Sequence, residues 1–162
     1  ILRVAAVTPD IRVADCNFNG ASAAALVSEA YEQGVSLLVL PELCLTGYTC
    51  SDLFLQESLL DGAGKALLTL TEATRDKNMV VLAGLPLTVN GVLYNVAAVL
   101  HDGDILGFVP KSYLPTYSEF YEGRHYHSGA DIETDVLLME ERIHLVPDFC
   151  SDAVRCRLLP LV

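Results

Sequence analysis

Two charged residues each follow an apolar run that ends in proline, and together their side chains could do chemistry. Glu42 comes directly after "VSLLVLP", and Lys111 comes directly after "ILGFVP". A carboxylate partly enclosed by apolar surface can serve as a general base, because burial disfavours its charged form. An ammonium group nearby can stabilise negative charge that develops on an oxygen atom. Each residue alone also has a structural explanation, since Glu42 can cap a turn or pair with an arginine and Lys111 can be an ordinary solvated lysine.

Other polar residues near this pair give weaker signals. Cys44 lies two residues after Glu42 within the turn-like "CLTGY", and we predict that it packs as a small buried hydrophobic residue. Tyr48, Tyr117 and Tyr121 can line a pocket or pack as core aromatic residues.

The composition excludes several classes of protein. The 162 residues include 21 acidic and 10 basic side chains, and a net charge of −11 attracts neither nucleic acid nor anionic lipid. No apolar run approaches the ~18 residues that span a bilayer, and no signal sequence opens the chain, so we expect a cytoplasmic protein. The five cysteines show no C-x-x-C spacing, and His125 and His127 have no further ligands at a suitable spacing. We therefore predict reduced thiols and no metal site.

The elements that must position Glu42 and Lys111 follow from the periodicity of apolar residues. Residues 2–8 predict a strand, and a helix follows with Asn19 as its N-cap and Gly34 just past its end. Residues 35–41 are almost continuously apolar, as in a strand that is buried on both faces. Residues 57–77 predict a second helix, and "MVVLAGLPL" predicts a third strand. This alternation predicts an α/β fold in which helices cover a sheet.

The pattern changes in the second half of the chain. The turn dipeptides "NG" at 90–91 and "DG" at 102–103 separate apolar runs and predict hairpins that end with a strand at 105–110. Residues 112–135 are rich in Tyr, His, Gly and Asp and predict a surface or active-site loop. From residue 136 the chain alternates between apolar and charged residues without a clear pairing partner.

With these residues assembled, the chain resembles the nitrilase (carbon-nitrogen hydrolase) superfamily. The resemblance rests on "LPELCLTGYTCSDLF" (40–54), "LYNVAAVLHDGDILGFVPKSYLPTYSEFYEGRHY" (93–126) and, more loosely, "VPDFCSDAVRC" (146–156). The first two motifs are specific in combination. Their "SDLF" and "YLPTYSEFYEGRHY" segments are most similar to the glutaminase domains of glutamine-dependent NAD+ synthetases.

The resemblance implies a fold and a set of site residues. The fold is an α/β four-layer αββα sandwich, of which residues 1–162 form one C-terminally truncated domain. In a Glu-Lys-Cys triad, Glu42 is the general base and Lys111 stabilises the oxyanion. Tyr117 contacts the substrate glutamine, Tyr48 lines the same pocket, and Glu119 is a supporting second carboxylate.

The third member of the triad is harder to locate. The chain ends in the apolar "RCRLLPLV", so we expect it to continue, with the nucleophilic cysteine just beyond Val162; Cys150 is the alternative. We accordingly expect the 162 residues alone not to hydrolyse glutamine. The resemblance also implies a homo-oligomer and a following synthetase domain that uses ATP and Mg²⁺ to consume the ammonia, with no cofactor in the present domain. The alternatives are a stand-alone amidase or nitrilase and a catalytically dead scaffold.

Overall fold

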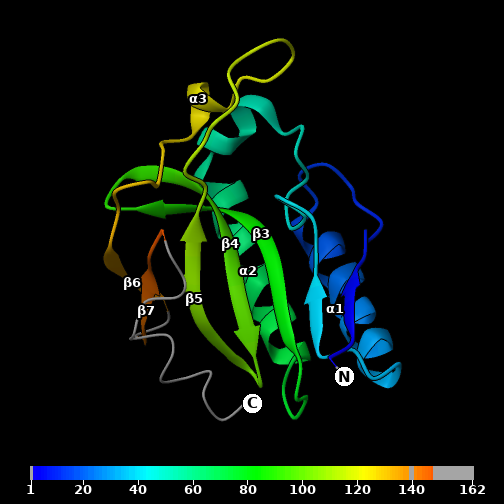
Figure 1. Cartoon of the computed structure of the whole chain (residues 1–162). Helices are drawn as coiled ribbons and strands as arrows, with labels where there is room; N and C mark the ends of the chain where they lie inside the picture. The colour runs from blue at the N-terminus through cyan, green and yellow to red at the C-terminus, as the bar shows by residue number, and fades with distance from the viewer. Residues whose placement is uncertain (1, 139–140, 148–162) are drawn as a thin grey trace.

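The computed structural model describes residues 2–138 and 141–147, which build one mixed β-sheet with helices beside it (Figure 1). The spatial order of the strands is β1-β2-β3-β4-β5-β7-β6. Their bounds are β1 Val4–Ala6, β2 Leu37–Val39, β3 Val80–Val89, β4 Val92–His101, β5 Asp104–Pro110, β6 Thr134–Leu138 and β7 Glu141–Leu145. The helices are α1 Cys16–Glu32, α2 Glu57–Ala73 and the short α3 Glu122–His125, with a 3₁₀ helix η1 at Ser51–Leu55.

The first three strands run parallel and are joined by the two long helices. β1 pairs with β2 through Val4 and Leu37, and β2 pairs with β3 through Leu37 and Val80. Parallel neighbours need a crossover connection, which α1 and α2 provide. The predicted alternation of strands and helices is confirmed, although β1 and β2 are only three residues long.

The first helix starts earlier than predicted, because Asp15 and not Asn19 is its N-cap. The Asp15 carboxylate accepts a hydrogen bond from the Phe18 N–H at 3.1 Å. Asn19 lies inside the helix, fully buried, and its side chain bonds to the backbone of Arg12 instead. The end of the helix is as predicted: Gly34 has a φ of 73°, a conformation that glycine adopts without strain.

Two hairpins extend the sheet at the predicted turns. The β3–β4 turn has φ values of 52° at Asn90 and 79° at Gly91, and the β4–β5 turn has 48° at Asp102 and 81° at Gly103. Positive φ at both central residues is typical of the type I′ turn, whose twist matches that of the flanking strands. β4 is antiparallel to both β3 and β5, so β5 runs in the same direction as β2.

The last described segments complete the sheet. The predicted loop at 112–135 contains the single short helix α3. The alternating segment that follows forms the hairpin of β6 and β7, and β7 joins the sheet parallel to β5 with Leu145 opposite Phe108. The pairing that the sequence left open is therefore made with β5, where the paired residues Phe108 and Leu145 are 145 − 108 = 37 residues apart.

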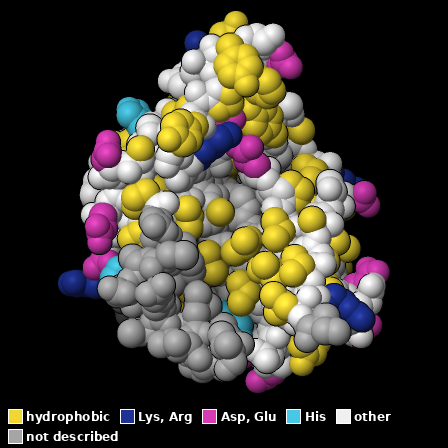
Figure 2. Space-filling model, in the orientation of Figure 1, with side chains coloured by type: hydrophobic (Ala, Val, Ile, Leu, Met, Phe, Trp, Pro, Cys, Tyr) yellow, Lys and Arg dark blue, Asp and Glu magenta, His cyan; other side chains and the backbone are white. Residues whose placement is uncertain are grey.

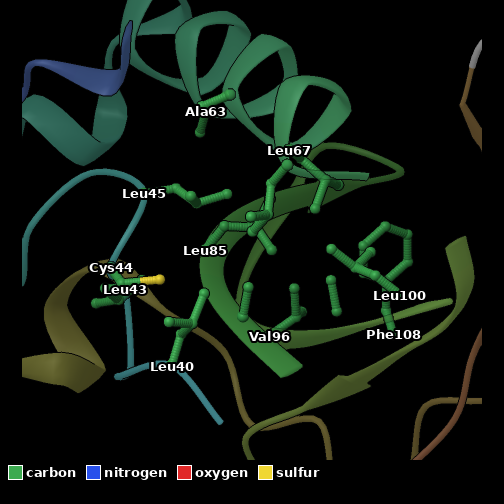
Figure 3. Packing of buried hydrophobic residues seen from close by; sticks show 14 of the residues in the cluster. Leu40, Leu43, Cys44, Leu45, Ala63, Leu67, Leu85, Val96, Leu100 and Phe108 are labelled. Atoms are coloured by element: carbon green, nitrogen blue, oxygen red, sulfur yellow. The ribbon is translucent and has the colours of Figure 1, made fainter. Parts of the chain in front are cut away.

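One face of the sheet forms the core with α2. Leu85, Val96 and Phe108 lie on neighbouring strands, each at most 2% exposed, and gather under Leu67 of α2 (Figure 3). Truncating a buried leucine such as Leu67 to alanine costs roughly 2–5 kcal/mol. Because side chains alternate along a strand, the residues between these core positions lie on the opposite face.

That opposite face is also apolar, as Figure 2 shows. It carries Val39, Leu82, Ala97 and Val109, each only partly buried. The described residues thus form two layers, one of helices and one sheet, rather than the four layers of the complete sandwich. The second pair of layers is not formed by residues 2–138 and 141–147.

Candidate active site

The carboxyl ends of β2 and β5 meet at one edge of the sheet, because the two strands run in the same direction. β2 ends at Val39 and leads to Glu42, while β5 ends at Pro110 and leads to Lys111. The Lys111 N–H donates a hydrogen bond of 2.8 Å to the carbonyl of Asn95 in β4. Ligands gather at such strand ends in α/β folds, and both predicted charges arrive there.

Gly84 in β3 lets the turn that carries Glu42 lie directly on the sheet. A Cβ atom at position 84 would lie 2.7 Å from the Cα of Glu42, closer than real side chains come to backbone. The Leu45 N–H donates to the Gly84 carbonyl at 3.3 Å and attaches the turn to β3. Leu43 has a φ of 51°, so the chain turns sharply immediately after Glu42. A side chain at position 84 would push the glutamate away from the sheet.

Lys111 lies between two carboxylates. Its Nζ atom is 2.7 Å from Glu42 Oε1 and 2.9 Å from Glu122 Oε1. The Glu122 side chain is 5% exposed, whereas that of Glu42 is 40% exposed. Burial alone would lower the pKa of Lys111, but the two carboxylates outweigh it and hold this pKa above its ordinary value. The site therefore keeps a charged ammonium group at neutral pH.

Two tyrosine side chains lie near Glu122. The Tyr48 hydroxyl donates to Glu122 Oε1 at 2.7 Å. Glu122 Oε2 and the Tyr126 hydroxyl are buried without a hydrogen-bond partner in the described part of the chain. Burial is the main cause that raises the pKa of Tyr48 and of Tyr126, so both phenols stay neutral in ordinary buffers.

Two cavities adjoin this network. The first has a volume of about 350 Å³ and is lined by Glu42, Asn95 and Lys111 together with apolar residues of the sheet. The second, of about 250 Å³, lies between η1 and α3 and is lined by Glu122 and by Tyr48, Phe54, Tyr121 and Tyr126. The first has the size of a small-molecule site with a few convergent polar groups. The predicted acid and ammonium thus share one cavity.

The other predicted site residues lie farther out. Tyr117 is 70% exposed, and its ring packs edge-on against Phe120 with centroids 5.8 Å apart. Glu119 is exposed, and hydrogen bonds from its own backbone and from Ser118 lower the pKa of its carboxyl. The structure places Glu122, not Glu119, as the second carboxylate against Lys111. The roles predicted for Tyr117 and Tyr48 in the substrate pocket and for Glu119 as a supporting carboxylate stay predictions.

The cysteines of the described part are all buried. Cys44 is 2% exposed, its thiol donates to the Gly84 carbonyl at 3.6 Å, and burial raises its pKa to about 11. Its predicted role as a small buried hydrophobic residue is confirmed. Cys16 and Cys50 are 5% and 2% exposed. Cys150 and the segment before Val162 lie outside the described residues.

A polar cluster attaches η1 to α3, the helix that begins at Glu122. Asp52 of η1 accepts two hydrogen bonds from Arg124, at 2.9 and 3.0 Å, and lies 3.0 Å from Nε2 of His125. The hydrogen bonds from Arg124, followed by that with His125, lower the pKa of Asp52 to about 2. Within residues 2–138 and 141–147, no group of three or more His, Cys, Asp or Glu side chains could hold a metal ion. The helices of the same residues are too short or too polar to span a lipid bilayer.

Two residues of the site were not singled out from the sequence. Asn95 is the amide in the otherwise apolar "LYNVAAVL" of β4, and Glu122 is one of two acids in the aromatic loop "YSEFYEGRHY". A buried asparagine within an apolar strand is a usable signal, because its amide must find partners. The choice between the two acids had no local signal.

Comparisons with known proteins agree with this geometry. A family model described as carbon-nitrogen hydrolase matches residues 3–147, a range that contains Glu42, Asn95, Lys111 and Glu122. The chain belongs to the carbon-nitrogen hydrolase family.

Curated proteins that resemble this chain include glutamine-dependent NAD+ synthetases. The one from Mycobacterium tuberculosis is 44% identical over 128 residues, which cover 79% of this chain and 19% of that protein. The one from Mycobacterium leprae is 38% identical over 147 residues, covering 91% of this chain and 22% of that protein. The chain thus spans about a fifth of the length of these relatives.

Solved structures show the same fold. A glutamine-dependent NAD+ synthetase from Cytophaga hutchinsonii superposes with a TM-score of 0.84 at 26% identity, covering 90% of this chain and 25% of that chain. An amidase from Nesterenkonia sp. gives a TM-score of 0.67 at 23% identity and covers 90% of this chain and 54% of that one. The nitrilase-like fold implied by the sequence motifs is therefore confirmed.

Proposed function

We propose that the chain is the glutamine-hydrolysing part of a glutamine-dependent NAD+ synthetase. The observation that carries the proposal is the ion pair between Glu42 and Lys111, 2.7 Å long, at the wall of a shared cavity. The 44% identity to a glutamine-dependent NAD+ synthetase supports glutamine as the substrate. In the proposed protein, a synthetase domain in the same polypeptide uses ATP and Mg²⁺ to convert deamido-NAD+ and the released ammonia into NAD+.

The proposed reaction splits amide hydrolysis into two steps. A cysteine thiol gives its proton to Glu42 while its sulfur attacks the side-chain amide carbon of glutamine. The C–N bond then breaks, the proton passes from Glu42 to the departing ammonia, and a thioester remains. Water, deprotonated by Glu42, attacks this thioester, and glutamate leaves as the thiol is restored.

Lys111 supplies the positive charge for both steps. Its ammonium group stays protonated between Glu42 and Glu122 and stabilises the oxyanion that forms as the carbonyl carbon becomes tetrahedral. Glu122 accepts hydrogen bonds from Lys111 and from Tyr48 and so holds the lysine at the strand end.

The nucleophile comes from outside the described residues. The three cysteines of the described part are buried, and the thiol of Cys44 is bonded to the carbonyl of Gly84. The motif resemblance assigns the nucleophile to a cysteine after Val162, with Cys150 as the alternative. Cys150→Ser in the complete encoded protein separates the two, because only the alternative predicts loss of hydrolysis.

The experiment measures glutamate release from glutamine by the complete encoded protein. Glu42→Gln and Lys111→Met are expected to lower kcat by about a hundredfold or more. Lys65→Met and Glu29→Gln remove the same charges from exposed positions on α2 and α1 and are expected to leave kcat unchanged.

Simple amides such as propionamide serve as competing substrates. A protein that hydrolyses them faster than glutamine is a stand-alone amidase, and the proposed substrate is then wrong. A protein that hydrolyses neither is a scaffold, and the proposed activity is wrong. Sedimentation of the same protein tests the expected homo-oligomer.

A further inference from the structure

Asn95 connects the two charged residues of the site to β4. It is 3% exposed, and its backbone carbonyl accepts the 2.8 Å hydrogen bond from the Lys111 N–H. Its side-chain amide Nδ2 donates to Glu42 Oε1. A single buried residue therefore contacts the main chain of the predicted oxyanion-stabilising lysine and the side chain of the predicted base.

The two carboxylate oxygens of Glu42 are not equivalent. Oε1 accepts from both Asn95 Nδ2 and Lys111 Nζ, whereas no hydrogen bond within the described part of the chain reaches Oε2. A carboxylate oxygen that already accepts two donors is a poor proton acceptor, because a proton there must displace one of them. The arrangement leaves Oε2 as the oxygen that can receive a proton beside the cavity.

We propose that Asn95 is a positioning residue for the general base, which fixes Oε1 of Glu42 and leaves Oε2 to carry the proton. The inference rests on the proposed function, since Asn95 acts through Glu42. An amide suits this role because it donates a hydrogen bond at every pH and carries no charge. An aspartate in its place would repel Glu42, and a leucine would leave Oε1 with the lysine alone.

Besides Asn95, the groups that face Glu42 are an ammonium with a second carboxylate and two phenols. Lys111 at the end of β5 is held protonated by its carboxylates, and Glu122 of α3 is bound to that lysine. The neutral phenols of Tyr48 and Tyr126 flank the site from the loop before η1 and from the end of α3. Among these groups only Glu42 accepts a hydrogen bond from the Asn95 amide, so a shift in the acid limb of the activity profile on changing Asn95 is assigned to Glu42.

The test uses the complete encoded protein with Asn95→Leu and Asn95→Asp, and glutamine hydrolysis is followed across pH. Loss of a hydrogen bond to the charged carboxylate disfavours that form, so the acid limb of kcat/KM moves to higher pH by about one to two units in the leucine variant. The aspartate variant shifts in the same direction. In both, kcat falls by about tenfold to a hundredfold while KM for glutamine changes little.

Asn19→Leu is the matched control. Asn19 is the other buried asparagine of the described part, 0% exposed, and its amide bonds to the carbonyls of Arg12 and Leu45 rather than to the site. This variant is expected to lower the urea midpoint of unfolding without moving the acid limb. An acid limb that stays at the wild-type pH in both Asn95 variants would overturn the proposal.

Two further outcomes separate this inference from the proposed function. If a simple amide is hydrolysed and glutamine is not, the proposed substrate fails, and the acid limb measured with that amide still decides the role of Asn95. If no amide is hydrolysed, a double-mutant cycle in the urea midpoint with Asn95→Leu and Glu42→Gln decides it. The proposal predicts that the urea midpoint of the double variant falls by less than the sum of the decreases in the two single variants, and strict additivity would overturn it.

Discussion

Glu122→Gln removes one negative charge from the network around Lys111 while keeping the size of the side chain. The Lys111–Glu122 pair is 2.9 Å long, with side chains 29% and 5% exposed. The burial of this pair is intermediate between that of an exposed ion pair, which contributes about 0–1 kcal/mol to stability, and that of a fully buried pair, whose disruption costs about 3–5 kcal/mol. Glu42 still compensates the lysine in the variant, so we expect a loss of about 2 kcal/mol in the free energy of unfolding.

The thermal assay follows from that magnitude. For a domain of this size, a loss of about 2 kcal/mol lowers Tm by about 4–8 °C. The glutamine amide can still accept the hydrogen bond from Tyr48, so the loss reports on the charge. Glu119→Gln, three residues earlier on the same loop, is the matched control, because that exposed carboxylate does not contact Lys111; its Tm is expected within about 1 °C of wild type.

The pH dependence gives a second readout with a defined sign. A lysine whose pKa is raised in the folded state contributes stability that is complete below its ordinary pKa of 10.5 and is lost as the pH rises through the folded value. The difference in Tm between wild type and Glu122→Gln is therefore expected to persist from about pH 7 to 9 and to shrink above about pH 10.5.

The same variant is expected to lower kcat about tenfold, since Lys111 loses one of its two carboxylate partners. A Glu122→Gln protein with the Tm of the Glu119→Gln control at pH 8 would refute this account of the network.

Three further expectations concern single residues. Gly84→Ala places a Cβ 2.7 Å from the Cα of Glu42 and is expected to lower the free energy of unfolding, measured in urea, by about 3 kcal/mol. In the control Gly64→Ala on α2, the added Cβ meets nothing within 4 Å, and the change is expected to be neutral or stabilising. Equal effects of the two substitutions would contradict the close approach at Gly84. The pKa of Asp52 is lowered to about 2, so its stabilising contribution is complete above the ordinary value of 3.8 and is lost as the pH falls toward 2. Asp52→Asn should therefore lower Tm at pH 6 and not at pH 2, and a constant difference would argue against the cluster. Cys44, with its pKa raised to about 11, should resist iodoacetamide at pH 8 in the folded protein and react after denaturation, as peptide mass spectrometry can show; rapid labelling of the folded protein would contradict its burial.

Local signals in the sequence were sufficient for the two long helices, for the strands up to β5 and for the positions of Glu42 and Lys111 just after strands. Glu42 and Lys111 each follow an apolar run of residues that ends in proline, and that pattern depends only on neighbouring residues. The turns at Asn90-Gly91 and Asp102-Gly103 were predictable for the same reason, since positive φ favours these residue types. The cap of α1 was predicted at the wrong residue, because Asp15 and Asn19 are both good caps and the choice depends on what surrounds them.

Only the tertiary structure decided which polar groups surround the two charges. Asn95 lies 53 residues from Glu42 in the sequence and reaches it because the turn after β2 lies on Gly84 of β3, the strand beside β4. Glu122 and Glu119 are separated by three residues, yet the path of the loop and the contact of α3 with η1 bring only Glu122 to Lys111. Hydrogen bonds and ion pairs act over a few ångströms, so residue type and periodicity determine which side chains can take part, and the folded path of the chain determines which of them meet.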